Sequence, residues 1–368
     1  MSIEVIQIIT KKQISAWHQF SRDLYRRDKF FISHIDQDIE SIFTPSKNSA
    51  FDSGDAQRWL AVKSGKYVGR IAAFFSHKTK QSGLGFFDCE NNQDVANSLF
   101  NTGINWLKER GFERVEAPIN FGERDKYWGL LVKGFDSPSY QENYNFPYYQ
   151  HLYETYGFRV CIEQTTSIGN PNLFDISKYE RFCNLLKINN QYRVEHYSHN
   201  NSEKYVSDFV TIYNDAWQHH AHFVPFTVER IRVLFKEMKL IIREEYLVFL
   251  YNGDIPIGFY LSIIELNQLF KHVNGNMNWW GKLKFYYHLK TQKITKIRGI
   301  IFGVTQAYQN KGLYALMIMD VYNSMMNDPH IHSSELAWIG DFNPKMHALF
   351  KNLNAIPSKV HYTYEKLL

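Results

Sequence analysis

The sequence of 368 residues contains no apolar run that approaches the roughly 20 residues a membrane-spanning helix needs. Its start, Met1–Ile6, lacks the basic and then apolar pattern of a secretion signal, so no export is expected. Cysteine is scarce, and Cys89, Cys161 and Cys183 are scattered without metal-ligand spacing. This predicts a cytoplasmic protein with free thiols. The formal net charge of +5 is too small to indicate a nucleic-acid partner, so none is expected.

Acidic side chains are absent from Leu266 to Met319, whereas this stretch carries eight basic residues: Lys271, Lys282, Lys284, Lys290, Lys293, Lys296, Arg298 and Lys311. Such one-sided charge suits a phosphate-bearing ligand or an anionic acceptor. Residues 276–290 also contain Trp279-Trp280 and Phe285-Tyr286-Tyr287, and a mixture of basic and aromatic side chains suits a lipid headgroup surface. Peripheral membrane contact is therefore one interpretation of 276–290. The alternative is a packed connector with solvated lysines.

The most informative stretch runs from Ile300 to Tyr322. It begins with an apolar, β-prone segment, continues with a polar segment that contains Gly312, and ends with helical spacing. This order predicts a strand, a tight loop and a helix start, where first-turn N–H groups have no partner within the helix. The acidic side chain of Asp320 comes too late to occupy the loop. Gly312 permits close backbone approach, so the loop suits an anionic phosphate group.

The two halves of the chain repeat one order of predicted elements. In each half a β-hairpin with a glycine turn precedes a strand, a helix, a strand and a helix. In the first half these five elements are predicted at 59–75, 85–89, 93–110, 115–119 and 147–156. In the second half they are predicted at 246–263, 300–305, 314–326, 334–339 and 343–353. The stretch 28–58 is predicted to be irregular. We therefore expect an α+β protein of two tandem modules, each a mixed, mostly antiparallel sheet flanked by helices. The modules are placed at 1–168 and 194–368, with a linker at 169–193.

The loop sequence Gln309-Asn-Lys-Gly312-Leu-Tyr314 resembles the Gln/Arg-x-x-Gly-x-Gly/Ala loop of GNAT-type N-acyltransferases. In that family the loop grips the pyrophosphate of acyl-coenzyme A. The second Gly/Ala position holds Tyr314 here, and Ala315 follows one place late. Segments at 134–138, 144–149 and 265–275 also resemble a group of bacterial two-module GNAT-like proteins of undefined substrate.

This resemblance implies a binding site for acetyl-CoA, or another acyl-CoA, on the second module. Its expected residues are Phe302, Val304, Gln309, Asn310, Lys311, Gly312, Leu313, Tyr314, Ala315 and Asn343. The matching loop of the first half, Glu90-Asn-Asn-Gln-Asp94, has no glycine and two carboxylates. Each carboxylate that lies close to a bound pyrophosphate would repel it at a cost of about 1 kcal/mol or more. We therefore expect the first module to be degenerate and to form a wall of the acceptor cleft.

Acyl transfer to an amine needs a base for the amine proton and a group that protonates the thiolate. The family often supplies the second group as a tyrosine on its last helix, in a pattern that ends here in Phe350. Tyr314, His347 or water could replace that tyrosine, or catalysis could be lost. Carboxylates near the ends of predicted strands are the candidate bases: Glu335, Asp341 and Glu265.

Candidate acceptor contacts are His219, His220, His222, Glu265 and Tyr153, which stands in the first half where the family tyrosine would stand. The histidine spacing does not place three imidazoles on one helical face, and no metal set is completed, so no metal is expected.

Two functions remain open. One is the transfer of an acyl group from acyl-CoA to the nitrogen of a small-molecule or peptide amine. The loop resemblance implies that this group is acetyl. The other is a non-catalytic CoA-binding protein, or an aminoacyl-transferring protein akin to the two-module peptidoglycan-bridge enzymes.

Overall fold

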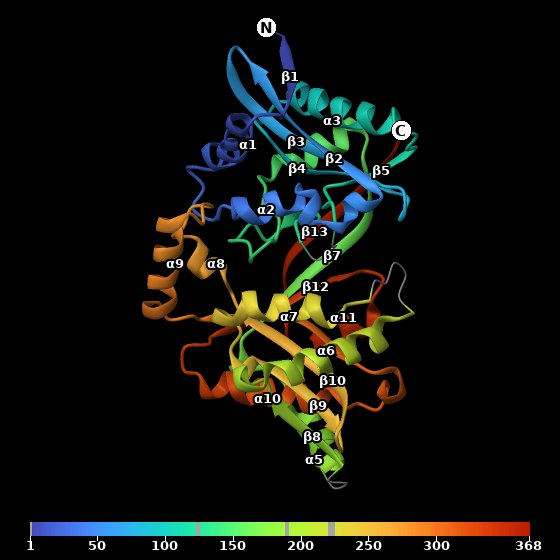
Figure 1. Cartoon of the computed structure of the whole chain (residues 1–368), viewed down its shortest axis with the longest axis vertical. Helices are drawn as coiled ribbons and strands as arrows, with labels where there is room; N and C mark the ends of the chain where they lie inside the picture. The colour runs from blue at the N-terminus through green and yellow to red at the C-terminus, as the bar shows by residue number, and fades with distance from the viewer. Residues whose placement is uncertain (1, 123–125, 188–190, 220–224) are drawn as a thin grey trace.

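The computed structural model describes residues 2–122, 126–187, 191–219 and 225–368, and the two halves of the chain stack along its long axis (Figure 1). The helices and strands of the first half are β1 (Ile3–Gln7), α1 (Lys11–Leu24), α2 (Asp36–Ile42), β2 (Gly54–Lys63), β3 (Lys66–Ser76), β4 (Gln81–Cys89), α3 (Gln93–Lys108), β5 (Arg114–Ala117), β6 (Leu130–Lys133), α4 (Tyr148–Tyr156) and β7 (Arg159–Gly169). Those of the second half are α5 (Ser177–Lys187), β8 (Tyr192–His196), α6 (Ser202–Trp217), α7 (Val228–Glu237), β9 (Leu247–Asn252), β10 (Ile255–Ile264), α8 (Asn267–Phe270), α9 (Trp279–Thr291), β11 (Lys296–Val304), α10 (Tyr314–Asn327), β12 (Ser333–Gly340), α11 (Pro344–Asn352) and β13 (Ile356–Leu367).

The strands of the described chain form one 13-stranded sheet, in the order β1-β2-β3-β4-β5-β13-β7-β12-β11-β10-β9-β8, with β6 paired to β13 beside this path. β4 and β5 are parallel, as are β11 and β12, whereas the other neighbours are antiparallel. Helices such as α3 and α10 pack on the sheet and bury their apolar faces there. The predicted α+β architecture of mixed, mostly antiparallel sheet with flanking helices is confirmed.

The last strand of the chain lies in the first half of the sheet. β13 pairs with β5, where Tyr364 is opposite Ala117, and on its other edge with β7, where His361 is opposite Gln164. β7 in turn pairs with β12 of the second half. Figure 1 shows the red C-terminal strand running beside the green β7 into the upper half of the molecule. The sheet is continuous across the halves, so the module boundaries stay a prediction.

Several segments differ from the sequence prediction. The stretch 28–58, expected to be irregular, contains α2, and the expected linker at 169–193 contains α5, which packs on α10. Residues 279–291 form α9. β13 was not predicted, although Val360–Tyr364 is a run of β-branched and aromatic residues, which favour strands.

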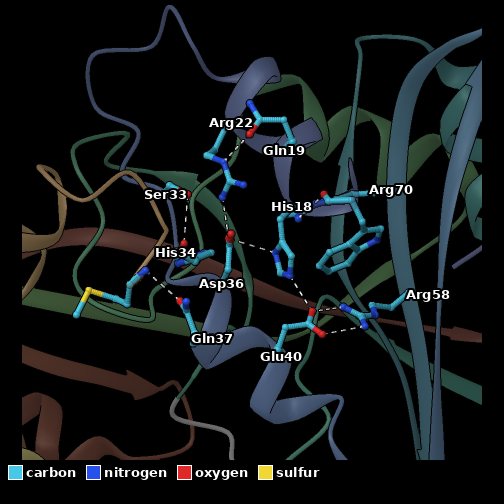
Figure 2. Close-up of polar contacts among 12 residues, drawn as sticks. His18, Gln19, Arg22, Ser33, His34, Asp36, Gln37, Glu40, Arg58 and Arg70 are labelled. Atoms are coloured by element: carbon cyan, nitrogen blue, oxygen red, sulfur yellow. Dashed lines mark hydrogen bonds and ion pairs between the residues drawn. The ribbon is translucent and has the colours of Figure 1, made fainter. Parts of the chain in front are cut away.

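A polar cluster fixes α2 against α1 and β2 (Figure 2). His18 of α1 is 4% exposed and lies between two carboxylates, with its Nδ1 3.4 Å from Asp36 and its Nε2 2.7 Å from Glu40. Arg58 of β2 donates to both carboxylate oxygens of Glu40, and Arg22 donates to Asp36 at 2.7 Å. Such charge-assisted hydrogen bonds are stronger than neutral ones, so the cluster holds α2 firmly in place.

Glu40→Gln is expected to lower the free energy of unfolding at neutral pH and to weaken its dependence on acid. Burial alone raises the pKa of the Glu40 carboxyl, but hydrogen bonds from His18 and Arg58, and the charge of Arg58, outweigh burial and lower the pKa to about 2. This contribution to stability is complete above the ordinary pKa of 4.5 and is lost as the pH falls toward 2. Urea unfolding at about pH 7 and about pH 3 measures it. The prediction would be contradicted if the wild type and the Glu40→Gln variant lost equal stability between about pH 7 and about pH 3.

Candidate active site

β11 and β12 pair over their first residues only and then separate. The parallel register runs from Lys296 to Gly299 of β11 and ends there, although β11 continues to Val304. On its other edge β11 stays paired with β10 as far as Val304, with a bulge at Ile300. The edge of β11 that faces β12 therefore lacks a partner among the described strands from Ile300 onward. Phe302 and Val304, predicted to contact a cofactor, lie on this separated part.

The loop between β11 and α10 presents a run of free backbone N–H groups. Asn310 and Gly312 have φ values of 61° and 71°, which turn the chain sharply before the helix. Within the described chain, the N–H groups of residues 310–314 donate to no acceptor, and Leu313, the residue before α10, provides no capping side chain. The first turn of α10 contains no acidic residue. Free N–H groups at the positive end of a helix suit a phosphate group. We call residues 310–314 the α10 cradle.

Neighbouring side chains hold the α10 cradle in place. The Gln309 side chain donates to the Val304 carbonyl at 3.0 Å and ties the loop to the end of β11. Leu313 and Ala315 are 1% and 2% exposed and anchor the loop in the core beneath it. Lys311 is exposed, and its ammonium lies 4.7 Å from the ring of Tyr308. The cradle is therefore ordered from below, and the ring of Phe182 in α5 lies beside Gly312, where an added Cβ atom would be 2.9 Å from it.

The equivalent place in the first half has no cradle. The Asn92 side chain caps α3 by accepting hydrogen bonds from the N–H groups of Asp94 at 3.0 Å and Val95 at 3.3 Å. β4 also stays close to the chain that follows β5, because a Cβ atom on Gly85 would lie 2.0 Å from the carbonyl oxygen of Ile119. The two halves thus have the same element order, but the capped helix of the first half presents no comparable anion site.

A buried charge cluster joins the two halves of the molecule. Glu335 of β12 is 1% exposed, and its carboxylate lies 3.1 Å from Lys296 and 3.3 Å from Arg298 of β11. Lys359 of β13 lies 3.7 Å from Glu335 and 2.6 Å from Glu142, in the segment before α4. We call these five residues the seam cluster. Because they come from four distant segments, the cluster links the halves.

Glu335 is poorly suited to the role of base that was predicted for it. Burial alone raises the pKa of its carboxyl, but the charges of Lys359, Lys296 and Arg298 outweigh burial and hold the pKa well below its ordinary range. A carboxylate that binds cations this tightly is a weak proton acceptor. We therefore propose that Glu335 joins strands and does not take a proton from a substrate.

Glu265 is buried next to the seam cluster, and the pKa of its carboxyl is shifted in the opposite direction from that of Glu335. Its Oε1 accepts hydrogen bonds from the N–H groups of Tyr140 and Asn267, both at 2.9 Å. Burial, and then the negative charge of Glu335, raise the pKa of Glu265. Because its partners belong to both halves, Glu265 holds the segment before α4 against α8.

A small cavity lies beside the point where β11 and β12 part. Both halves contribute to its lining, which consists of Tyr127, Trp128, Gln141, Glu142, Gln164, Arg298, Trp338 and His361. Arg298 belongs to the paired part of β11, and Trp338 belongs to β12 beyond the last pair. The cavity therefore adjoins the separated strands, and we call it the seam cavity.

His361 is the side chain of the seam cavity best suited to accept a proton. Its Nε2 lies 3.1 Å from the carbonyl oxygen of Asn143, which can only accept, so Nε2 carries the hydrogen and Nδ1 carries a lone pair. Burial lowers the pKa of His361, so the ring is neutral at physiological pH. His361 was not predicted from the sequence, because β13, which carries it, was not predicted.

Other predicted acceptor contacts lie away from this cavity or outside the described residues. Tyr153 is fully buried among the aromatic side chains of the first half, and burial raises the pKa of its hydroxyl. His219 is exposed just after α6, and His220 and His222 lie outside the described residues. No group of His, Cys, Asp or Glu with metal-binding geometry occurs in the described part of the chain.

The remaining predicted residues lie near the ends of β12 and β11. Asp341 is exposed directly after β12, and the Asn343 side chain caps α11 by accepting from the N–H of Met346 at 3.3 Å. The Tyr314 ring meets Tyr179 of α5 edge to face, with ring centres 6.5 Å apart. Phe350 is 8% exposed and fills the core, so the last helix offers no hydroxyl there.

The chain has full-length relatives at low identity. No protein-family model matches it. It is 24% identical over 375 residues to protein YghO of Escherichia coli K12, a match that covers 97% of this chain and 94% of YghO. It is 23% identical over 381 residues to the bacterial ceramide synthase of Caulobacter vibrioides NA1000, a match that covers 100% of this chain and 98% of the relative.

Solved structures decide the fold. A tandem GNAT protein from the clavulanic acid biosynthesis pathway superposes with a TM-score of 0.59 at 9% identity, over 100% of this chain and 98% of that chain. The protein has a tandem GNAT-like fold. A GCN5-related glucosamine N-acetyltransferase region of a fungal multi-domain GH3 β-N-acetylglucosaminidase gives a TM-score of 0.60 at 11% identity, over 99% of this chain and 38% of that protein. The predicted two-module GNAT-like architecture is confirmed, and identities this low concern the fold alone.

Proposed function

We propose that the protein is an N-acyltransferase that binds acyl-CoA on its second module. The observation that carries this proposal is the α10 cradle, whose free N–H groups at a helix start suit a pyrophosphate. Residues Gln309–Ala315 would hold the phosphates, and Phe302 and Val304 would border the rest of the cofactor where β11 leaves β12. Asn343, which caps α11 after β12, would contact the cofactor from that side. When bound, acyl-CoA supplies an activated acyl carbonyl.

We further propose a fatty acyl group and a long-chain amino alcohol as the substrates. Support comes from the full-length relative named ceramide synthase, because a ceramide is a long-chain amino alcohol whose nitrogen carries a fatty acyl group. Acetyl-CoA, which the loop resemblance implies, is the shorter alternative.

Amide formation removes one proton from the amine and returns one to the thiolate, while a C–N bond forms and a C–S bond breaks. We assign the first proton to Nδ1 of His361, which lines the seam cavity beside the separated strands. The neutral ring accepts the proton, and the Asn143 carbonyl holds the ring in one orientation. Phe350 has no hydroxyl, so Tyr314, His347 and water remain the candidates for the second proton.

The proposed function is tested with the purified protein, sphinganine as the amine, and either palmitoyl-CoA or acetyl-CoA. We expect release of free CoA thiol that requires the amine, faster with palmitoyl-CoA, together with the N-acylated product in a mass spectrum. Calorimetric titration with CoA reports binding separately. No heat with CoA up to about 1 mM would overturn the proposal. Binding of CoA without turnover of either thioester would instead favour the non-catalytic function.

His361→Gln is expected to lower kcat by about 100-fold or more while the Kd for CoA is unchanged, because glutamine keeps an N–H for Asn143 but offers no basic nitrogen. Since the pKa of His361 lies below 6.5 and the deprotonated ring is the active form, kcat of the wild type should fall only below about pH 6.5. His332→Gln, at an exposed histidine, is the matched control. An unchanged kcat in a folded His361→Gln protein would remove His361 from the mechanism.

A further inference from the structure

The outer face of α9 is apolar, aromatic and uncovered. Its exposed fractions are 66% for Trp279, 66% for Trp280, 44% for Leu283, 50% for Tyr286 and 62% for Tyr287. Offsets of 4, 7 and 8 residues from Trp279 bring Leu283, Tyr286 and Tyr287 to the same side of a helix. These five residues, which we call the α9 face, form a continuous patch instead of scattered apolar side chains.

The charge that α9 itself carries has one sign. Lys290 lies within the patch, with its ammonium 5.7 Å from the ring of Tyr286, and Lys282 and Lys284 are exposed at its borders. No Asp or Glu occurs between Leu266 and Met319. The patch is therefore complementary to a surface that is apolar within and negatively charged outside.

The opposite side of α9 accounts for its packing. Gly281 is buried, the ring of Phe285 lies 5.1 Å from the ring of Phe270, and Leu289 packs on the same core. The rings of His288 and His272 stack with their centres 3.7 Å apart. Because this inner side already attaches the helix, the aromatic side chains of the outer face are not needed for folding.

α9 is also fixed to the first half of the molecule. The Asp36 N–H donates to the Gly275 carbonyl at 2.7 Å, and the Gln37 side chain accepts from the N–H of Met277 at 3.1 Å. Asp36 and Gln37 belong to α2, which the cluster in Figure 2 holds in place. Figure 1 shows α9 at the side of the molecule, at the level where the two halves meet. The α9 face is thus presented on a rigid base, which reduces the entropy lost on binding.

We propose that the α9 face docks on the surface of an anionic phospholipid bilayer. Trp and Tyr side chains favour the headgroup region, where one end of the ring is apolar and the other is hydrated. Lysines at the borders are attracted by anionic headgroups, and Leu283 reaches toward the acyl boundary. No helix in the described ranges is long and apolar enough to cross a membrane, so the contact is peripheral. The proposal does not rest on the proposed function, but it would place the protein where amphiphilic substrates accumulate.

The test uses the full-length protein and flotation with vesicles of phosphatidylcholine alone or mixed with phosphatidylglycerol. We expect binding to the anionic vesicles, a blue shift of tryptophan emission, and binding that weakens as salt rises. Trp279→Ser with Trp280→Ser should weaken binding at least tenfold, and so should Lys284→Glu with Lys290→Glu. Leu240→Ser and Ile255→Ser remove side chains that are 63% and 60% exposed elsewhere, and should change nothing.

Three outcomes would overturn the proposal. The first is no binding of the wild type to anionic vesicles, and the second is an equal loss in the α9 and control variants. The third is that the α9 substitutions change the oligomeric mass of the protein in sedimentation. Equally contrary would be a wild type that binds a short RNA as tightly as vesicles, with that binding abolished in the α9 variants. These two results would assign the α9 face to a second copy of the chain or to a nucleic acid, respectively. CoA titration of the same variants should match the wild type, which separates this proposal from the proposed function.

Discussion

Lys359→Met is expected to lower the free energy of unfolding by about 3–5 kcal/mol, because it removes one partner from a buried ion pair and leaves the other charge uncompensated. Lys359 is 4% exposed and lies 2.6 Å from Glu142 and 3.7 Å from Glu335. Burial lowers the pKa of its ammonium, but the charges of Glu142 and Glu335 outweigh burial and raise the pKa, so the lysine is charged in the folded protein. Methionine preserves the length and the apolar part of the side chain. The loss therefore reports the charge and not the packing.

Urea unfolding at neutral pH measures the effect, with Lys351→Met at an exposed position of α11 as the matched control. Glu142→Gln, added to Lys359→Met, removes the carboxylate that was left without its partner. The double variant should therefore recover about 1–3 kcal/mol relative to the sum of the single variants. A loss below about 1 kcal/mol for Lys359→Met would mean that the seam cluster does not link the halves energetically.

The α10 cradle could be predicted from the sequence because its determinants are local. A β-prone segment, a polar loop with Gly312 and a helical segment follow each other without interruption, and the loop contains no acid to fill the site. The same local reasoning separated the two halves, since the loop Glu90–Asp94 has no glycine and two carboxylates. In the structure, Asn92 of this loop also caps α3. The tandem arrangement followed from the repeated order of elements. For these features, sequence order and spatial order coincide.

The seam cluster and the seam cavity could not be predicted in the same way, because they depend on which strands pair. Lys359 and His361 reach them only because β13 leaves the second half and lies between β5 and β7. Local propensity indicates a strand at Val360–Tyr364 but does not name its neighbours. Glu335 was predicted to be a base, but its cations on β11 and β13 determine its protonation. Long-range pairing thus decides which polar residues have chemical roles at the seam.

Gly312→Asp is expected to weaken CoA binding much more than Gly312→Asn. Gly312 has a φ of 71°, in the left-handed region where Asn and Asp are the best-tolerated replacements. Either side chain brings a Cβ atom to 2.9 Å from the Phe182 ring, so that ring must shift equally in both variants. The variants differ in one respect, since Asp adds a negative charge to the cradle. At intermediate dielectric this costs about 2–4 kcal/mol, or roughly 30–1000-fold in Kd.

Calorimetric titration of both variants with CoA, at low and at high salt, measures the difference. It should shrink as salt screens the added charge, whereas a purely steric effect would not. Asn92→Ala is the control in the first module. It removes the cap of α3 and should lower the free energy of unfolding by about 1 kcal/mol without changing the Kd for CoA. Equal Kd values for Gly312→Asp and Gly312→Asn would place the phosphates away from the α10 cradle. Because the acyl-CoA site rests on that cradle, the acyltransferase proposal would then lose its physical basis, while the tandem GNAT-like fold would stand.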